Sequence, residues 1–256
     1  MNTVFSKDCL AGGTYLVTGA SSGIGQSAAK LIAQCGAKVI ISGRNATRLN
    51  ETLFSLEGIG HFASAVDLID ADQTADWMKG IIQEHGTLSG VFHSAGIALI
   101  RPVRMTKQTQ LNDVFGSSLF AAFGIARTAS QKNSIVDGGS LVFMSSVAGL
   151  TGQHGMTAYS AAKAGIDALV RSLACEMASR KIRVNSIVAG AVKTAMHDRL
   201  AQTGNEDAMT DYEKSHLLGF GEIDDISNAA VYLLSSASRW ITGVDLVIDG
   251  GYVVKK

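Results

Sequence analysis

The chain has 256 residues, of which 46% are hydrophobic, and its 22 acidic and 22 basic residues give a formal net charge of zero. This balance excludes the basic footprint of a nucleic-acid-binding protein and the polybasic surface that attracts a protein to an anionic membrane. Because the length and hydrophobic content allow one sizeable core, we expect a single domain over residues 1–256 that serves a small-molecule site.

The three cysteines, Cys9, Cys35 and Cys175, lack the spacing of metal ligands, which predicts reduced thiols and no metal site. The first ten residues contain Lys7 and Asp8 and no apolar stretch of signal-peptide length. No later run reaches the roughly 18 apolar residues that a membrane span needs. We therefore expect a soluble, cytoplasmic protein without nucleic-acid or membrane partners.

Short apolar runs alternate with longer helical stretches along the chain, which predicts βαβ units. Several runs lack a polar alternation, and this suits strands that helices cover on both faces. We therefore predict an α/β fold: a single-domain, Rossmann-like, doubly wound parallel sheet of about seven strands flanked by helices. The predicted strands are 15–18, 38–42, 62–66, 90–93, 140–144, 183–188 and 245–248.

A glycine-rich turn joins the first predicted strand to a helix that begins near Ile24. Glycines let the backbone turn sharply and let a pyrophosphate approach the helix N-terminus, whose amide dipoles favour anions. The turn predicts a dinucleotide cofactor bound by Gly19, Ser21, Ser22, Gly23, Ile24 and Gly25.

Tyr159 and Lys163 stand four residues apart on a predicted helix over 156–179, and Ser146 precedes Tyr159 by thirteen residues. Positions i and i+4 share a helix face, so we expect the Lys163 ammonium to lie beside the Tyr159 phenol. A neighbouring cation favours the ionised phenol and would lower its pKa from about 10. Such a phenol suits proton donation to a carbonyl oxygen while a hydride reaches the carbon.

These motifs, together with Asp249-Gly250-Gly251, make the chain resemble the short-chain dehydrogenase/reductase family from about Thr14 to Tyr252. The resemblance implies that Tyr159 is the proton donor and that Ser146, chosen over Ser145 by its spacing, binds the substrate oxygen. It also implies that Lys163 holds the nicotinamide ribose and keeps Tyr159 acidic.

Cofactor choice is set at the end of the second strand, where an acidic side chain would repel a 2'-phosphate. Gly43 stands where NAD-dependent relatives carry Asp, and Arg44 stands where NADP-dependent relatives often place a guanidinium. The resemblance therefore implies NADP(H). The alternative is that Arg44 is only a solvated residue, since Ser22 is neutral where many NADP enzymes have a second basic residue.

The resemblance implies further cofactor contacts at the ends of later strands. Asp67 matches a position that contacts adenine, although an ordinary strand-end aspartate is the alternative. The other implied contacts are Leu68, Ser94, Ala95, Gly96, Gly190, Val192 and Thr194, in addition to Tyr159 and Lys163.

The chain departs from the family pattern in three places. His93 and Ser94 replace two asparagines before Ala95 and Gly96, and we interpret His93 as a structural or cofactor-shell residue rather than a general acid. Twenty-five residues after His93, Ser118 stands where relatives use an asparagine to anchor a water that links the lysine to solvent. We expect Ser118 to weaken this relay without abolishing it, with Ser117 and Asp113 as other occupants. Ala189 replaces a proline, which leaves that loop less stiff.

Helices predicted over 108–131 and 156–179 match helices that pair across subunits in the family, so the resemblance implies a homotetramer.

The segment 196–221 is either a mobile substrate lid or a surface helical excursion. The leading hypothesis is an NADP(H)-dependent carbonyl reductase, working in either direction and resembling 3-oxoacyl-[acyl-carrier-protein] reductases. The alternatives are a sugar, steroid or secondary-metabolite carbonyl as substrate, or a non-enzymatic NADPH-binding regulator.

Overall fold

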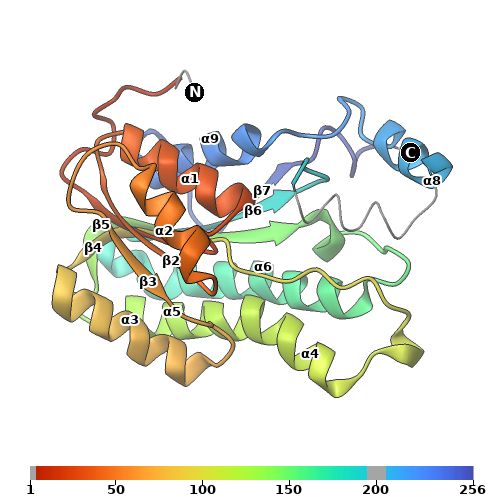
Figure 1. The fold of residues 1–256 in the computed structure, drawn as a ribbon, viewed down its shortest axis with the longest axis horizontal. Coiled ribbons are helices and arrows are strands. Elements are labelled where there is room, and N and C mark those ends of the chain that lie inside the picture. The colour runs from red at the N-terminus through yellow and green to blue at the C-terminus, as the bar shows by residue number, and fades with distance from the viewer. Residues whose placement is uncertain (1–3, 195–205, 256) are drawn as a thin grey trace.

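The structure, a computed structural model, describes residues 4–194 and 206–255. Seven parallel strands form one sheet in the order β3-β2-β1-β4-β5-β6-β7 (Figure 1), which confirms the predicted fold class. The strand order reverses direction between β1 and β4, so the carboxyl ends of these two strands border a crevice. The strands are β1 (Thr14–Thr18), β2 (Lys38–Gly43), β3 (Phe62–Ala65), β4 (Leu88–His93), β5 (Ile135–Ser146), β6 (Arg183–Ala189) and β7 (Asp245–Ile248).

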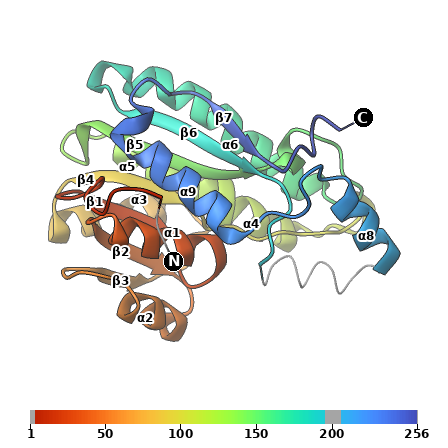
Figure 2. The same ribbon diagram turned by 90° about the horizontal axis from the view of Figure 1, so that it is seen from above.

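Helices cover both faces of the sheet. One face carries α1 (Gly23–Gln34), α2 (Ala46–Phe54) and α9 (Ile223–Leu234), and the other carries α3 (Ala71–His85), α4 (Gln108–Phe115), α5 (Ala121–Ala129) and α6 (Thr157–Met177) (Figures 1 and 2). A further helix, α8 (Glu206–Lys214), stands beyond the carboxyl ends of the strands. Within the described ranges, no helix is both long and apolar enough to cross a membrane.

Adjacent residues of the central strands enter two different hydrophobic cores. Leu16 and Val91 face the core beneath α3, α5 and α6, whereas Val17 and Phe92 face the core beneath α1 and α9. All four side chains are fully buried. This two-sided burial explains why the strands read as apolar runs without alternation.

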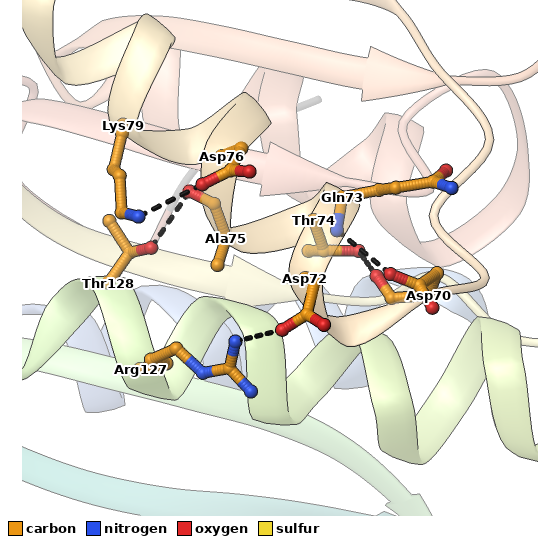
Figure 3. A network of polar contacts seen from close by, with 9 residues as sticks. All are labelled: Asp70, Asp72, Gln73, Thr74, Ala75, Asp76, Lys79, Arg127 and Thr128. Carbon is orange, nitrogen blue, oxygen red and sulfur yellow. Dashed lines mark hydrogen bonds and ion pairs between the residues drawn. The ribbon is translucent and has the colours of Figure 1, made fainter.

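Helices α3 and α5 approach closely because Gly124 lacks a side chain: a Cβ there would lie 2.5 Å from the Ala71 carbonyl oxygen. The buried hydroxyl of Thr128 donates to the Ala75 carbonyl at 2.9 Å, and Arg127 pairs with Asp72 at the rim (Figure 3). These contacts hold α3 and α5 together, and the chain continues from α5 toward the site.

One π-helical turn, Gly116–Phe120, joins α4 to α5. The predicted helix over 108–131 therefore exists, but with a wider turn in its middle. Leu119 of this turn packs on α6, where a Cβ on Gly165 would lie only 2.8 Å from Leu119 Cδ2. Such turns are common at functional sites, and this one positions Ser118.

Candidate active site

A cavity of about 350 Å³ opens at the carboxyl ends of β1, β2, β3 and β4. The structure brings thirteen of the predicted cofactor residues into its lining, from five separate segments of the chain. They are Gly19, Ser21, Ser22, Gly23, Ile24, Gly25, Arg44, Asp67, Leu68, Ser94, Ala95, Gly96 and Thr194.

Other predicted residues stand outside this lining: Tyr159, Lys163, Gly190 and Val192. Conversely, Ile97 and Ala98 line the cavity although sequence reasoning did not select them, and Ser117, which was considered only for the relay position, lines it as well. Their position directly beside Gly96 and Ser118 in the chain was the available signal.

The glycine-rich turn is packed so closely that side chains would block it. Gly19 has a φ of +69°, and a Cβ on it would lie 2.8 Å from the Ala95 amide nitrogen. A Cβ on Gly25 would lie 2.4 Å from the Gly19 carbonyl oxygen, so α1 starts against the end of β1. Ser22 occupies the N-cap of α1 without a side-chain capping bond, which leaves amide donors at the helix start available to an anion.

The end of β2 carries one cation and no acidic side chain. A Cβ on Gly43 would lie 3.1 Å from Ser21 Oγ and 3.2 Å from Ser21 Cβ, so a larger residue would displace Ser21. The guanidinium of Arg44 lies 3.8 Å from a carboxylate oxygen of Asp67, and both side chains are at least half exposed. This exposed pair is weak and leaves Arg44 able to bind a ligand phosphate.

Ser146 and Tyr159 meet between the end of β5 and the first turn of α6. Ser146 Oγ accepts a hydrogen bond from the Ala148 amide at 3.2 Å, and the Ser146 hydroxyl is near enough to the Tyr159 phenol to lower the pKa of that phenol. Withdrawal of the phenol from water raises the pKa of Tyr159 to about 12, and the Ser146 hydroxyl opposes that rise. Tyr159 is therefore protonated throughout the neutral range.

Lys163 is buried one helical turn further along α6. Its Nζ donates to the Met144 carbonyl at 2.9 Å and lies 5.6 Å from the centroid of the Tyr159 ring. Burial lowers the pKa of Lys163 to about 8, while the nearby Asp167 carboxyl acts in the opposite direction.

The expected acidification of Tyr159 by Lys163 is therefore not found, because the pKa of Tyr159 rises above its ordinary value. The two residues do share a helix face, as the spacing predicts. However, the ammonium lies over the ring, and the loss of hydration dominates the titration of the phenol.

Of the three residues considered for the relay position, Ser118 is the one that approaches Lys163. A Cβ on Gly96 would lie 3.1 Å from Ser118 Oγ and 3.4 Å from Lys163 Nζ, so both groups border the same small space. Ser117 Oγ instead donates to the Asp113 carbonyl at 2.7 Å. Asp113 itself is exposed.

His93, at the end of β4, is buried behind the cavity wall. Its Nδ1 lies 2.8 Å from Thr18 Oγ1, and its Nε2 lies 3.1 Å from the Ser118 carbonyl oxygen. Burial lowers the pKa of His93 to about 4, and the charge of Lys163 adds to the effect. The imidazole is therefore neutral at physiological pH.

The chain after β6 is held from two sides. The Gly190 amide donates to the Ile248 carbonyl at 2.9 Å, and the Ala191 amide donates to His216 Nε2 at 3.2 Å. Sequence reasoning missed the buried His216, since nothing in its local pattern distinguishes it from a surface histidine. Of the predicted lid over 196–221, the part 196–205 falls outside the described residues.

Comparisons with known proteins give one consistent group of relatives. The family model described as "Enoyl-(Acyl carrier protein) reductase" matches residues 19–253. The 3-oxoacyl-[acyl-carrier-protein] reductase of Staphylococcus aureus is 31% identical over 239 residues, which cover 92% of this chain and 96% of that protein. Carbonyl reductase family member 4 of Danio rerio is 34% identical over 237 residues, with the same shares covered.

Solved structures agree with these sequence matches. A chain from Sinorhizobium meliloti superposes with a TM-score of 0.91 at 32% identity, and the match covers 98% of this chain and 100% of that one. A short-chain type dehydrogenase/reductase from Mycobacterium ulcerans gives a TM-score of 0.88 at 30% identity, with 96% and 92% covered.

Proposed function

Because this chain belongs to the short-chain dehydrogenase/reductase family, we propose that it is an NADP(H)-dependent oxidoreductase that interconverts a carbonyl and a secondary alcohol. The observation that carries the proposal is the grouping of Ser146, Tyr159 and the buried Lys163, whose Nζ lies 5.6 Å from the centroid of the Tyr159 ring. A dinucleotide-binding protein without chemistry needs no proton donor at this position.

The cavity fits an NADP-type dinucleotide in three respects. The close approach at Gly19 and Gly25 leaves only backbone where a pyrophosphate would rest, and the start of α1 offers free amide donors. Arg44 supplies a guanidinium for the 2'-phosphate, and at Gly43 the side chain of an acidic residue that would select NAD would crowd Ser21.

When bound, NADPH supplies a hydride to the carbonyl carbon of the substrate. Tyr159 donates its proton to the carbonyl oxygen, on which negative charge grows. Ser146 donates a second hydrogen bond to that oxygen and orients it between the two hydroxyls. Since the phenol is protonated at neutral pH, Tyr159 already carries the proton that it donates in the reductive reaction.

Lys163 has two roles in this proposal. Its ammonium binds the nicotinamide ribose and stabilises the phenolate that Tyr159 becomes after proton donation. The Met144 carbonyl accepts a hydrogen bond from Nζ and so keeps Nζ over the Tyr159 ring. In the reverse direction, the phenolate accepts the proton of the alcohol.

We propose a 3-oxoacyl thioester as substrate, in line with the S. aureus relative. Two other substrate classes have specific support. The description of the matching family model favours a 2-enoyl thioester, and gluconate 5-dehydrogenase of Gluconobacter oxydans, 28% identical over 249 residues, favours a sugar-derived carbonyl. The third alternative is an NADPH-binding regulator without turnover.

A substrate panel tests these proposals. NADPH and NADH oxidation is followed with a 3-oxoacyl thioester, a 2-enoyl thioester, a keto-sugar acid and a steroid ketone. Turnover of the first compound with NADPH is the expected result. Tyr159→Phe should lower kcat by about 10²–10⁴-fold, whereas Tyr232→Phe, on α9 behind the sheet, should have no effect. NADPH binding without turnover of any compound, in either direction, would favour the regulator.

We also propose a single domain and a homotetramer. One continuous sheet supports the first, and exposed aromatic side chains on the helix preceding α6 support the second: Phe120 and Phe123 are 44% and 50% exposed. Sedimentation velocity of wild type and Phe123→Glu tests the assembly, which the charge should dissociate. The cytoplasmic location stays a prediction from the sequence.

A further inference from the structure

Resting on the proposed function, we propose that His93 is a positioning residue that holds the backbone of Ser118 so that the Ser118 hydroxyl returns protons to Lys163. His93 replaces the expected asparagine, and its two ring nitrogens bind to two different parts of the site. In this role His93 affects the proton supply without contacting the substrate.

The hydrogen bonds around His93 have only one consistent direction. A carbonyl oxygen can only accept, so the contact with Ser118 requires the hydrogen on Nε2. Nδ1 of the neutral ring then accepts from the Thr18 hydroxyl, and that hydroxyl in turn accepts from the Ala95 amide at 3.3 Å. The chain therefore runs from the cavity wall at Ala95, through β1 and β4, to the turn that carries Ser118.

Burial makes this arrangement rigid. His93 is 1% exposed, and Thr18 and Ser118 are completely buried. Phe143 packs its ring edge-on against the imidazole with 6.0 Å between centroids. Breaking either hydrogen bond would leave a buried polar group without a partner, which is unfavourable.

The Ser118 carbonyl belongs to the π-helical turn. Here the Ala121 amide reaches back to the Gly116 carbonyl, five residues earlier, which widens the helix at Ser118. His93 donates into this widened turn from the sheet and so fixes its rotation about the helix axis. That rotation decides where the Ser118 hydroxyl points.

The hydroxyl of Ser118 is buried and has no hydrogen-bond partner within residues 4–194 and 206–255. It lies near Lys163 Nζ beside Gly96, where a Cβ would lie 3.1 Å from Ser118 Oγ and 3.4 Å from Nζ, so a side chain at this position would crowd both groups. A buried hydroxyl beside an ammonium is a site for one water molecule, which would bond to both groups. Because His93 Nε2–H and the Ala121 amide both bond to the Ser118 carbonyl, the hydroxyl is the group of Ser118 left to hold that water.

The proton balance of the path is simple. After Tyr159 gives its proton to the substrate oxygen, the phenolate regains one from the ammonium of Lys163. The amine of Lys163 then takes a proton from the water held by Ser118, and solvent restores that water. No electrons move in these steps, and every group ends in its starting state.

Two substitutions of His93 separate its two hydrogen bonds. His93→Gln places an amide donor near the former Nε2 and keeps the bond to Ser118, whereas His93→Asn is too short and keeps only the acceptor for Thr18. We expect kcat of His93→Gln within about threefold of wild type and kcat of His93→Asn at least about tenfold lower. The Kd for NADPH should change by less than about threefold in both variants.

Two readouts distinguish a proton path from a general structural role. His93→Asn should enlarge the solvent deuterium isotope effect on kcat and alter its pH profile. Ser118→Ala should do the same, and the double variant should be no slower than the slower single variant, since both act on one path. Fully additive losses, or an unchanged isotope effect and pH profile in His93→Asn, would overturn the inference.

A measurement on the wild type guards against variants that fail to fold. Nitrogen-15 NMR of the histidine rings should show His93 with its hydrogen on Nε2. A hydrogen on Nδ1 would contradict the proposal. A wild type that turns over no carbonyl or alcohol would refute the proposed function. If the wild type is active but the His93 variants have the same kcat, isotope effect and pH profile as the wild type, only this inference is refuted.

Discussion

Lys163 lies over the ring of Tyr159, with Nζ 5.6 Å from the ring centroid and bonded to the Met144 carbonyl. The cation thus faces the π electrons of the ring, while the nearby Ser146 hydroxyl lowers the pKa of the phenol. In the proposed reaction, Ser146 therefore adjusts the acidity of the resting phenol, and Lys163 stabilises the phenolate when it forms.

The first prediction concerns the pH dependence of reduction. Tyr159, with a pKa of about 12, stays protonated, whereas Lys163, with a pKa of about 8, loses its charge as the pH rises through that value. The rate of carbonyl reduction should therefore be level from about pH 6 to 7.5 and should fall above about pH 8. A pH–rate profile of kcat checks this, and a decline that begins below pH 7 would contradict it.

The second prediction is that the buried Lys163 lowers stability. Its pKa falls from 10.5 to about 8 on folding, so the unfolded chain binds more protons between these values and stability rises with pH there. Below pH 8 the buried charge costs about 3 kcal/mol. Lys163→Met should abolish turnover and raise the free energy of unfolding at pH 7 by about 1–3 kcal/mol.

Urea unfolding measures this effect, with Lys79→Met as the control. Lys79 is a partly exposed lysine on α3 that pairs with Asp76 (Figure 3), and its replacement should leave stability almost unchanged. Destabilisation by Lys163→Met would show that the contacts of the ammonium outweigh its lost hydration.

The third prediction tests cofactor choice at Arg44. Arg44→Ala removes the guanidinium at the end of β2 and should raise the KM for NADPH at least about tenfold, while the KM for NADH changes little. Arg239→Ala removes an exposed arginine far from the cavity and should change neither value. Equal use of NADH and NADPH by the wild type would refute NADP specificity.

The fourth prediction follows from the contact between Gly43 and Ser21. Gly43→Asp alone should weaken the binding of both cofactors, because its Cβ would press on the Ser21 side chain. Gly43→Asp combined with Ser21→Gly removes the obstruction and should reverse the preference toward NADH. Fluorescence titration with each cofactor gives the four Kd values, and a single variant that already binds NADH well would contradict the steric argument.

The fifth prediction concerns acid stability. The pKa of His93 falls from 6.5 to about 4 on folding, so the unfolded chain binds more protons in that window and stability is lost as the pH drops through it. Wild type should therefore lose about 3 kcal/mol more than His93→Asn between pH 6.5 and pH 4. Asp167 titrates in the same range in both proteins, so only the difference between their unfolding curves is informative.

Most of the fold was predictable because buried parallel strands leave a direct pattern in the sequence. All seven predicted runs are strands, although β5 begins earlier than expected, at Ile135, and β4 begins at Leu88. The π-helical turn was not predictable. It arises where the chain packs on α6 and the sheet, and propensity alone does not specify such a turn.

For the candidate site, spacing predicted which residues the fold brings together but not their electrostatics. The four-residue interval placed Tyr159 and Lys163 on one face, yet it did not predict that lost hydration would outweigh the cation in setting the phenol's pKa. Similarly, the position of His93 in the sequence indicated a buried residue, but its link to Ser118 depends on two segments that meet only in the folded chain.

The packing of Leu119 against Gly165 has a consequence for redesign of the pocket. Gly165 follows Lys163 by two residues, and its missing side chain is filled by Leu119 from the widened turn. This close contact resists a sliding movement of α6 along its axis. Attempts to admit bulkier compounds should therefore reshape the loop between Leu150 and Met156, because displacing α6 would move Tyr159 and Lys163 together.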